Sequence, residues 1–340
     1  MILRMPAYCR EFKCIADKCS DSCCIGWEID IDEKTADFYK NAGGKLGEKL
    51  RASIRNENGC SFILENERCP FLDENNLCEI ILNMGEDKLS QICTDHPRYY
   101  EWFYDVKEGG IGMCCEEATR IILEKGDEEG YWDREISDEV CDEYDDELYD
   151  CLYEAREKLF SYLRNGNISV ASAVSGILAF SEELQDKLDN GDYTVSEIEN
   201  NSVIIGKPDC NAMLDIFGSL EPIDEKWKPY VDALKTRSYN GLLSENEKYL
   251  KNVLAYFLWR YFMKGVFDGE ILSKVKLAVI SAAMLSVMFG EERDEKKKII
   301  LAKNYSKEIE YSGENLEKIY DMTYTEKVFS SDELKKFFIK

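Results

Sequence analysis

Hydrophobic residues recur at helical spacing over most of the second half of the chain. Across Glu245–Phe267 they lie three or four residues apart, which places them on one broad face of a helix. The run Leu148–Leu163 has the same spacing and ends before Asn165 and Gly166, residues that favour a helix stop. The spacing also predicts helices over Ser169–Leu188, Ile271–Phe289, Lys296–Tyr305, Glu314–Met322 and Ser331–Phe338. The second half is therefore predicted to be mainly helical.

Strict alternation of apolar and polar residues, which is typical of a half-buried strand, is rare in this chain. The segment WEIDID, Trp27–Asp32, alternates and is predicted to form a short strand. The sequence has no regular succession of strands and helices and no internal repeat. The predicted fold class is mainly α: a Cys-rich metal-binding N-terminal domain with few short strands, joined to a helical C-terminal domain.

Two composition changes divide the chain. Eleven of the 14 cysteines lie before residue 116, and 13 of the 24 residues in Asp127–Asp150 are acidic. An acidic block of this kind is typical of a solvated connector, and a patch that attracts a lysine-rich substrate is the alternative. We therefore predict a Cys-rich metal-cluster domain over 1–126, an acidic linker over 127–150 and a helical domain over 151–340.

The overall composition excludes several classes of protein. The 340 residues include 68 acidic and 43 basic side chains, and the formal net charge of −25 argues against general nucleic-acid binding because phosphates would be repelled. The N-terminus lacks the apolar run of a secretory signal. The most apolar segment, Leu277–Phe289, has 13 residues, fewer than the about 20 of a membrane span. We expect a cytoplasmic protein that binds neither nucleic acid nor membranes.

The cysteines form closely spaced groups. These groups are Cys14-x4-Cys19-x3-Cys23-Cys24, Cys69-Pro-Phe-Leu-x5-Cys78, Cys93-Thr-Asp-His96-Pro97-Arg98 and Cys114-Cys115. Thiols at such spacing can converge on one metal centre, whereas structural disulfides are rare in a reducing compartment. Ordinary buried cysteines explain one or two positions, not eleven. The chain has one histidine, which excludes zinc sites of the Cys2His2 type. Both a four-iron cluster, which we favour, and zinc suit sulfur-rich coordination.

Three segments taken together resemble the flagellin lysine-N-methylase family. They are KCIADKCSDSCCIGWEIDID, CPFLDENNLCEIILNMGEDKLSQICTDHPR and GGIGMCCEEATRIIL, within about residues 5–125. The specific elements are Cys-Cys-x-Gly-Trp, Cys-Pro-Phe-Leu and Cys-x3-Pro-Arg, in this order. The chain departs from the family pattern at His96, where an aromatic residue is usual, and at Cys114–Ala118, where Ser-Cys-Pro-Glu-Ala is expected.

The resemblance implies N-methylation of lysine side chains on flagellin, with S-adenosylmethionine as methyl donor and a cysteine cluster that activity requires. The metal ligands that it implies are Cys14, Cys19, Cys23, Cys24, Cys69, Cys78, Cys93 and Cys114. The alternative function is a metal-binding or redox-sensing module without methylase activity. The sequence does not indicate the target lysines, the degree of methylation or the oligomeric state.

Candidate catalytic residues lie close to the third cysteine group. His96 is a candidate metal ligand or general base, and a partly buried polar side chain before a proline turn is the alternative. Arg98 is a candidate for binding a carboxylate, although a salt bridge to one of the many acidic residues fits equally well. Tyr99 is a candidate only because it lies near these motifs.

The sequence lacks the common signatures of methyl-donor binding. Radical S-adenosylmethionine enzymes carry Cys-x3-Cys-x2-Cys, and Gly26 stands where the third thiol would follow Cys19 and Cys23. No Gly-x-Gly motif lies between a predicted strand and helix, and the Asn-His-Ser signature of SET domains is absent. A donor site in this protein is therefore expected to differ from the common designs, and its position is not predicted.

Overall fold

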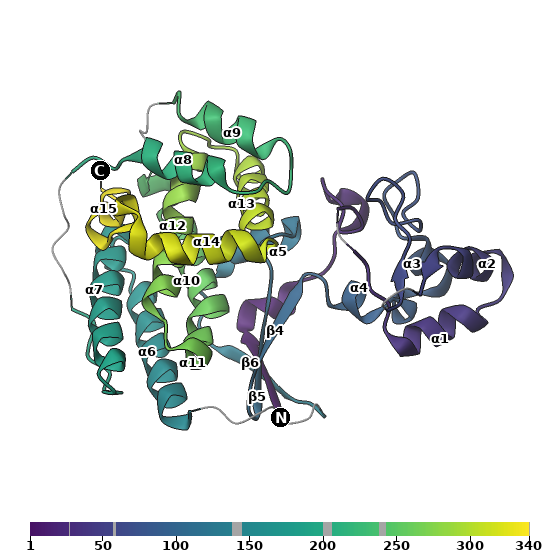
Figure 1. Ribbon diagram of the computed structural model, residues 1–340, viewed down its shortest axis with the longest axis horizontal. Helices are drawn as coiled ribbons and strands as arrows, with labels where there is room; N and C mark the ends of the chain where they lie inside the picture. Colours follow the sequence, from purple (N-terminus) through teal and green to yellow (C-terminus); the bar gives the residue numbers. More distant parts are fainter. Residues whose placement is uncertain (27, 57–58, 138–144, 200–205, 238–242, 340) are drawn as a thin grey trace. The chain divides into compact units, whose positions relative to one another are not determined.

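The computed structural model describes residues 1–340 except 27, 57–58, 138–144, 200–205, 238–242 and 340. The chain divides into two compact units. Unit 1 comprises Met1–Phe12, Tyr100–Cys114 and Ala118–Lys340, and unit 2 comprises Lys13–Tyr99 and Cys115–Glu117. Figure 1 traces the chain through both units by its colours. The fold class is mainly α with few short strands, as predicted.

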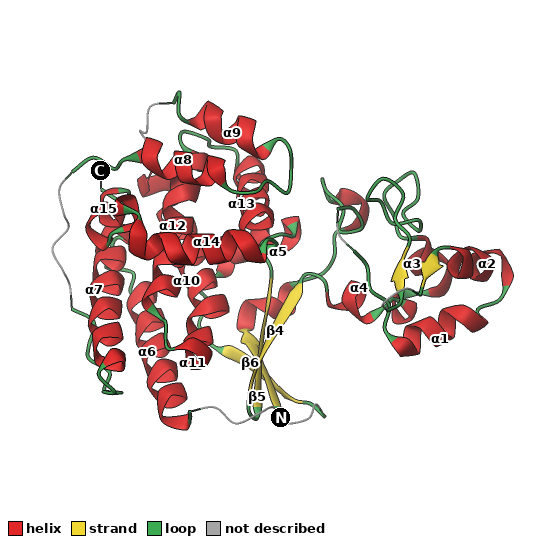
Figure 2. Cartoon of the chain, in the orientation of Figure 1, coloured by secondary structure: helices red, strands yellow, loops and turns green. Residues whose placement is uncertain are grey.

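Helices make up most of unit 1 (Figure 2). They are α5 (Glu116–Lys125, whose first two residues belong to unit 2), α6 (Asp146–Arg164), α7 (Val170–Asp189), α8 (Cys210–Ser219), α9 (Trp227–Leu234), α10 (Leu243–Tyr261), α11 (Gly265–Asp268), α12 (Leu272–Phe289), α13 (Glu295–Glu310), α14 (Gly313–Thr325) and α15 (Ser331–Lys336). The predicted helices correspond to α6, α7, α10 and α12–α15, with ends that differ by up to six residues.

Helix α12 forms the centre of unit 1 and packs against α7, α10, α13 and α14. By length and composition it is the one candidate membrane span among the described helices, with a mean hydropathy of 1.7. However, 94% of this segment is buried inside the fold. Its apolar residues therefore cover the whole helix circumference because they face protein on all sides, which is typical of a central core helix.

The predicted helix Glu245–Phe267 is divided in the structure. Helix α10 ends at Tyr261, and a 3-10 turn over Phe262–Lys264 separates it from α11. Gly265 begins α11 where the chain packs tightly, because a Cβ atom there would lie 2.5 Å from Cγ2 of Ile271. The apolar spacing continues through the break, so the periodicity alone did not reveal it.

Unit 1 also contains a four-stranded sheet that the sequence pattern did not predict. Its order is β4-β5-β1-β6, formed by β1 (Ile2–Pro6), β4 (Arg98–Phe103, whose first two residues belong to unit 2), β5 (Val106–Ile111) and β6 (Tyr131–Glu135). Strand β1 pairs parallel with β5, Ile2 opposite Val106, and antiparallel with β6, Leu3 opposite Arg134. This pairing joins segments about a hundred residues apart, and local alternation does not report it.

The sheet explains why the two units differ from the predicted division at residue 126. Strands β1 and β5 both lie before that residue, yet their pairing assigns them to the helical unit. The predicted acidic linker 127–150 contains strand β6 and the first turns of α6, so it is not a linker throughout. Its residues 138–144 lie outside the described part of the chain.

Unit 2 is small and built around one hydrophobic core. Its helices and strands are α1 (Glu33–Asn41), α2 (Gly44–Ala52), β2 (Ile54–Arg55), β3 (Ser61–Phe62), α3 (Glu79–Met84) and α4 (Gln91–Asp95). The predicted strand Trp27–Asp32 is wrong in this form. Trp27 lies outside the described residues, and Asp30 makes only an isolated bridge to Ser61. The segment is nevertheless anchored, because Ile29 and Ile31 are buried.

Candidate functional site

Four cysteines of unit 2 belong to the same hydrophobic core or pack against it. Cys69 is buried within the core, and Cys24, Cys78 and Cys93 are partly buried against it. They come from four separate segments: a loop before α1, the loop after β3, the N-terminal cap of α3, and helix α4. The compact core therefore brings together thiols that are up to about 70 residues apart in the sequence.

Backbone contacts hold these cysteine loops against one another. The amide of Cys69 donates a hydrogen bond to the carbonyl of Cys24 (2.8 Å), and an isolated bridge joins Leu72 to Cys78. Gly26, in the Cys-Cys-x-Gly motif, has a φ of +86°, a left-handed conformation that favours glycine. This conformation explains why the motif carries glycine at the second position after its cysteine pair.

The charges of these thiols affect one another's pKa values, and Cys23 contributes to the pKa values of Cys24, Cys78 and Cys93. A hydrogen bond with the Cys23 thiol and burial raise the pKa of Cys24, and the charges of Cys69 and Cys78 add to this effect. Burial raises the pKa of Cys69 to about 12 and that of Cys93 to about 11, again with contributions from Cys78. Each of these five thiols thus affects the pKa of at least one of the others or has its own pKa affected by one of them. A cation among them would favour their charged forms.

Hydrogen-bond donors also face these sulfur atoms. Burial raises the pKa of Cys78, whereas the backbone amides of Ile81 and Ile80 at the start of α3 oppose that shift. The backbone amide of Phe71 acts on Cys69 in the same way. Amide donors of this kind stabilise thiolates. In iron–sulfur centres, hydrogen bonds to the sulfur ligands help to set the reduction potential.

Three of the eight predicted ligands lie elsewhere. Cys14 is exposed and accepts a hydrogen bond from the amide of Ala16 (3.4 Å). The Cys19 thiol lies 3.9 Å from a carboxylate oxygen of Glu116. Cys114 belongs to unit 1. Among the described residues, no group of three or more His, Cys, Asp or Glu side chains is arranged to hold a metal ion.

Cys114 lies beside a buried polar network of unit 1. Its sulfur atom is 2.8 Å from the hydroxyl of Tyr311, and burial raises its pKa to about 11. The neighbouring Glu310 carboxylate is fully buried, accepts hydrogen bonds from Tyr256 (2.9 Å) and Tyr261 (3.0 Å), and pairs with Arg260 (2.9 Å). These contacts provide the partners that a buried carboxylate needs, so they compensate its loss of contact with water.

The candidate catalytic residues lie at the end of unit 2. His96 is the C-terminal cap of α4, three residues after Cys93, and is half-buried. Arg98 and Tyr99 begin strand β4 and are also half-buried. The structure keeps all three near the Cys93 segment of the chain, and their roles stay predictions.

Glu116 lies outside the candidate residues named above, and it is buried with an exposed fraction of 7%. Its carboxylate accepts hydrogen bonds from the amide (2.8 Å) and the hydroxyl of Ser20, next to Cys19. Glu116 therefore anchors the loop that precedes the Cys23–Cys24 pair. The only signal in the sequence was its position directly after Cys114-Cys115.

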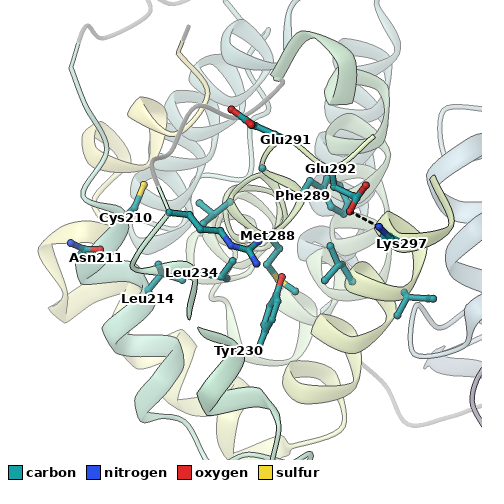
Figure 3. Close-up of a pocket in the computed structure, with 15 residues that line it drawn as sticks. Cys210, Asn211, Leu214, Tyr230, Leu234, Met288, Phe289, Glu291, Glu292 and Lys297 are labelled. Carbon is teal, nitrogen blue, oxygen red and sulfur yellow. Dashed lines mark ion pairs between the residues drawn. The ribbon is translucent and has the colours of Figure 1, made fainter. Parts of the chain in front are cut away.

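A cavity of about 690 Å³ lies in unit 1 among α8, α9, α12 and α13 (Figure 3). Its polar lining includes Tyr230, Arg237, Glu291, Glu292 and Lys297. Volumes of this size are typical of small-molecule sites. Sequence reasoning missed the cavity because its walls come from four helices whose apolar residues resemble ordinary core positions.

The comparison with protein families matches the helical part of the chain. Residues 156–337, more than half of the chain, match the model described as the FliB lysine N-methylase C-terminal domain. The matched range includes every residue that lines the cavity.

Curated relatives give a consistent picture. The lysine-N-methylase of Salmonella typhimurium is 24% identical over 219 residues, which cover 57% of this chain and 50% of that protein. The flagellar biosynthetic protein FliU of Salmonella muenchen is 30% identical over 132 residues, 36% of this chain and 77% of that protein. The chain thus spans about half the length of the lysine-N-methylases that it matches. No solved structure matches it.

Proposed function

Since this chain belongs to the family with the FliB lysine N-methylase C-terminal domain, we propose that it is a cytoplasmic protein-lysine N-methyltransferase that acts on flagellin. The observation that carries the proposal is the match over residues 156–337. The name of the relative FliU, a flagellar biosynthetic protein, supports a flagellar substrate. The formal net charge of −25 also favours the approach of a lysine-rich target.

The proposed donor is S-adenosylmethionine, and the reaction is a direct displacement. The lone pair of a neutral lysine ε-amine attacks the methyl carbon opposite the sulfonium. The new C–N bond forms as the C–S bond breaks, its electron pair goes to sulfur, and S-adenosylhomocysteine leaves. The methylated ammonium then releases a proton. The protein must position the two reactants and favour the unprotonated amine, both of which are ordinary means of enzymatic catalysis.

We also propose that the thiols of unit 2 hold a metal centre, a four-iron cluster in preference to zinc. The residues that would hold it are drawn from the five thiols Cys23, Cys24, Cys69, Cys78 and Cys93. These ligands suit such a centre chemically, because thiols are soft ligands and backbone amides nearby can donate hydrogen bonds to their sulfur atoms. Such a centre, when bound, would tie the cysteine loops together and, as iron, supply redox chemistry.

The test is the intact mass of flagellin co-expressed with this chain. We expect a gain of whole methyl units, which the double variant Cys23→Ser, Cys69→Ser abolishes. Cys60→Ser is the matched control, since Cys60 packs against the same core but is not a predicted ligand. If flagellin keeps its mass beside folded, metal-loaded protein, the methylase proposal fails and a metal-binding or redox-sensing role takes its place.

A further inference from the structure

The cavity in unit 1 combines an apolar wall with a small number of charged groups. The apolar side chains that line it include Leu214, Leu234, Val287, Met288, Ile300 and Leu301. They come from α8, α9, α12 and α13, so the wall is built on packed helices. A flat apolar ring system of a ligand would bury its surface against this wall, which is the main source of affinity in sites of this kind.

Tyr230 carries an unsatisfied polar group at the cavity. Its hydroxyl oxygen is buried and has no hydrogen-bond partner among the described residues. Figure 3 shows this hydroxyl extending from α9 toward Met288. A buried hydroxyl without a partner costs free energy, so a ligand that hydrogen-bonds to it gains from satisfying it. The face of the same ring can also attract a cation.

The charged groups of the lining fall into two sets. Glu292 and Lys297 pair with each other at 3.4 Å, and Glu292 also accepts hydrogen bonds from two backbone amides of its own loop, both at 3.0 Å. Arg237 and Glu291 make no ion pair within the described part of the chain. The lining therefore offers one guanidinium and one carboxylate to a ligand.

We propose that this cavity binds S-adenosylmethionine, an assignment that rests on the proposed function. In this arrangement Arg237 binds the carboxylate of the donor, and Glu291 attracts its ammonium and sulfonium groups. The adenine ring lies on the apolar wall, and the Tyr230 hydroxyl gains a hydrogen bond. This ligand carries one carboxylate and two positive charges, an ammonium and a sulfonium, which the single guanidinium and the acidic groups complement.

The same charges disfavour a nucleoside triphosphate. Its phosphates would need several cations, yet Lys297 is paired and Glu291 and Glu292 both lie in the lining. Like charges at this range repel one another. ATP therefore serves as a probe that shares the adenosine part of the donor and differs in the charged part.

The test is calorimetric binding of S-adenosylmethionine, S-adenosylhomocysteine and ATP to the whole purified chain. We expect both sulfur compounds to bind and ATP to bind at least about tenfold more weakly. Arg237→Gln should weaken binding about tenfold or more, because one charge-assisted hydrogen-bonded pair is lost. Arg293→Gln is the matched control: Arg293 is exposed, pairs with Glu245 at 3.5 Å and does not line the cavity.

A second measurement uses the unsubstituted protein. Cys210 lines the cavity, and we expect S-adenosylhomocysteine to slow its alkylation several-fold, as mapped by peptide mass spectrometry. Cys60 of unit 2 should react at an unchanged rate. The cavity assignment is overturned if the chain binds the donor, Arg237→Gln does not weaken that binding and the ligand does not slow the alkylation of Cys210. The proposed function would still stand in that case. Protection of Cys210 without methylation of flagellin would support the cavity and overturn the substrate.

Discussion

The buried ion pair between Glu108 and Arg156 provides a quantitative prediction about unit 1. Both terminal nitrogens of the Arg156 guanidinium donate to the Glu108 carboxylate at 2.6 Å, and the Arg156 and Glu108 side chains are 0% and 5% exposed. Glu108 is on β5 and Arg156 is on α6, so the pair joins the sheet to the helices. The guanidinium also lies 4.4 Å from the ring centre of Trp259.

Glu108→Leu would leave the Arg156 guanidinium buried without its carboxylate. Two charge-assisted hydrogen bonds of about 1.5–3 kcal/mol each are lost, and removing one partner of a buried pair costs about 3–5 kcal/mol in general. We therefore expect the free energy of unfolding to fall by about 3–5 kcal/mol. The double variant Glu108→Leu, Arg156→Met should lose less than the single variant, because no buried charge is left without a partner.

The measurement is urea denaturation of the whole chain, followed by tryptophan fluorescence and far-ultraviolet circular dichroism. The pair Lys264–Glu101, at 2.6 Å and partly exposed, supplies the control, and Glu101→Gln should cost less than about 1 kcal/mol. A cost below about 1 kcal/mol for Glu108→Leu would refute the reasoning. So would a double variant whose loss equals the sum of the two single losses.

Two further predictions concern the thiols. Cys69→Ser should remove most of the bound metal found by elemental analysis of the purified chain, whereas Cys114→Ser should retain it, because Cys114 lies in unit 1 beside Tyr311; equal metal content in both variants would contradict the five-thiol assignment. Burial raises the pKa of Cys210 to about 11, so its thiol is protonated at neutral pH and its thiolate fraction grows as pH rises. Its alkylation rate should therefore increase about tenfold per pH unit between about pH 8 and 10. A rate that levels off near pH 8.5, as for an ordinary cysteine, would show that the thiol is not buried.

The sequence predicted well those features that depend on neighbouring residues. The apolar face of α7 lies within a single run of twenty residues, so its periodicity predicted the helix to within a residue or two at each end. The cysteine groups were visible for the same reason, because each motif is a short local pattern. Shorter helices such as α8 and α9 were missed, since ten and eight residues contain too few turns for a periodic pattern to stand out.

The tertiary structure decided which of these local patterns come together. Strand β1 pairs with β5 across about a hundred residues, and this pairing assigns Cys114 to unit 1 although its motif resembles the others. The core of unit 2 gathers Cys24, Cys69, Cys78 and Cys93 because their segments bury apolar neighbours together. Local spacing specifies which residues can share one helix face or loop. Which loops and faces meet depends on burial and strand pairing between distant segments, and these contacts exist only in the folded chain.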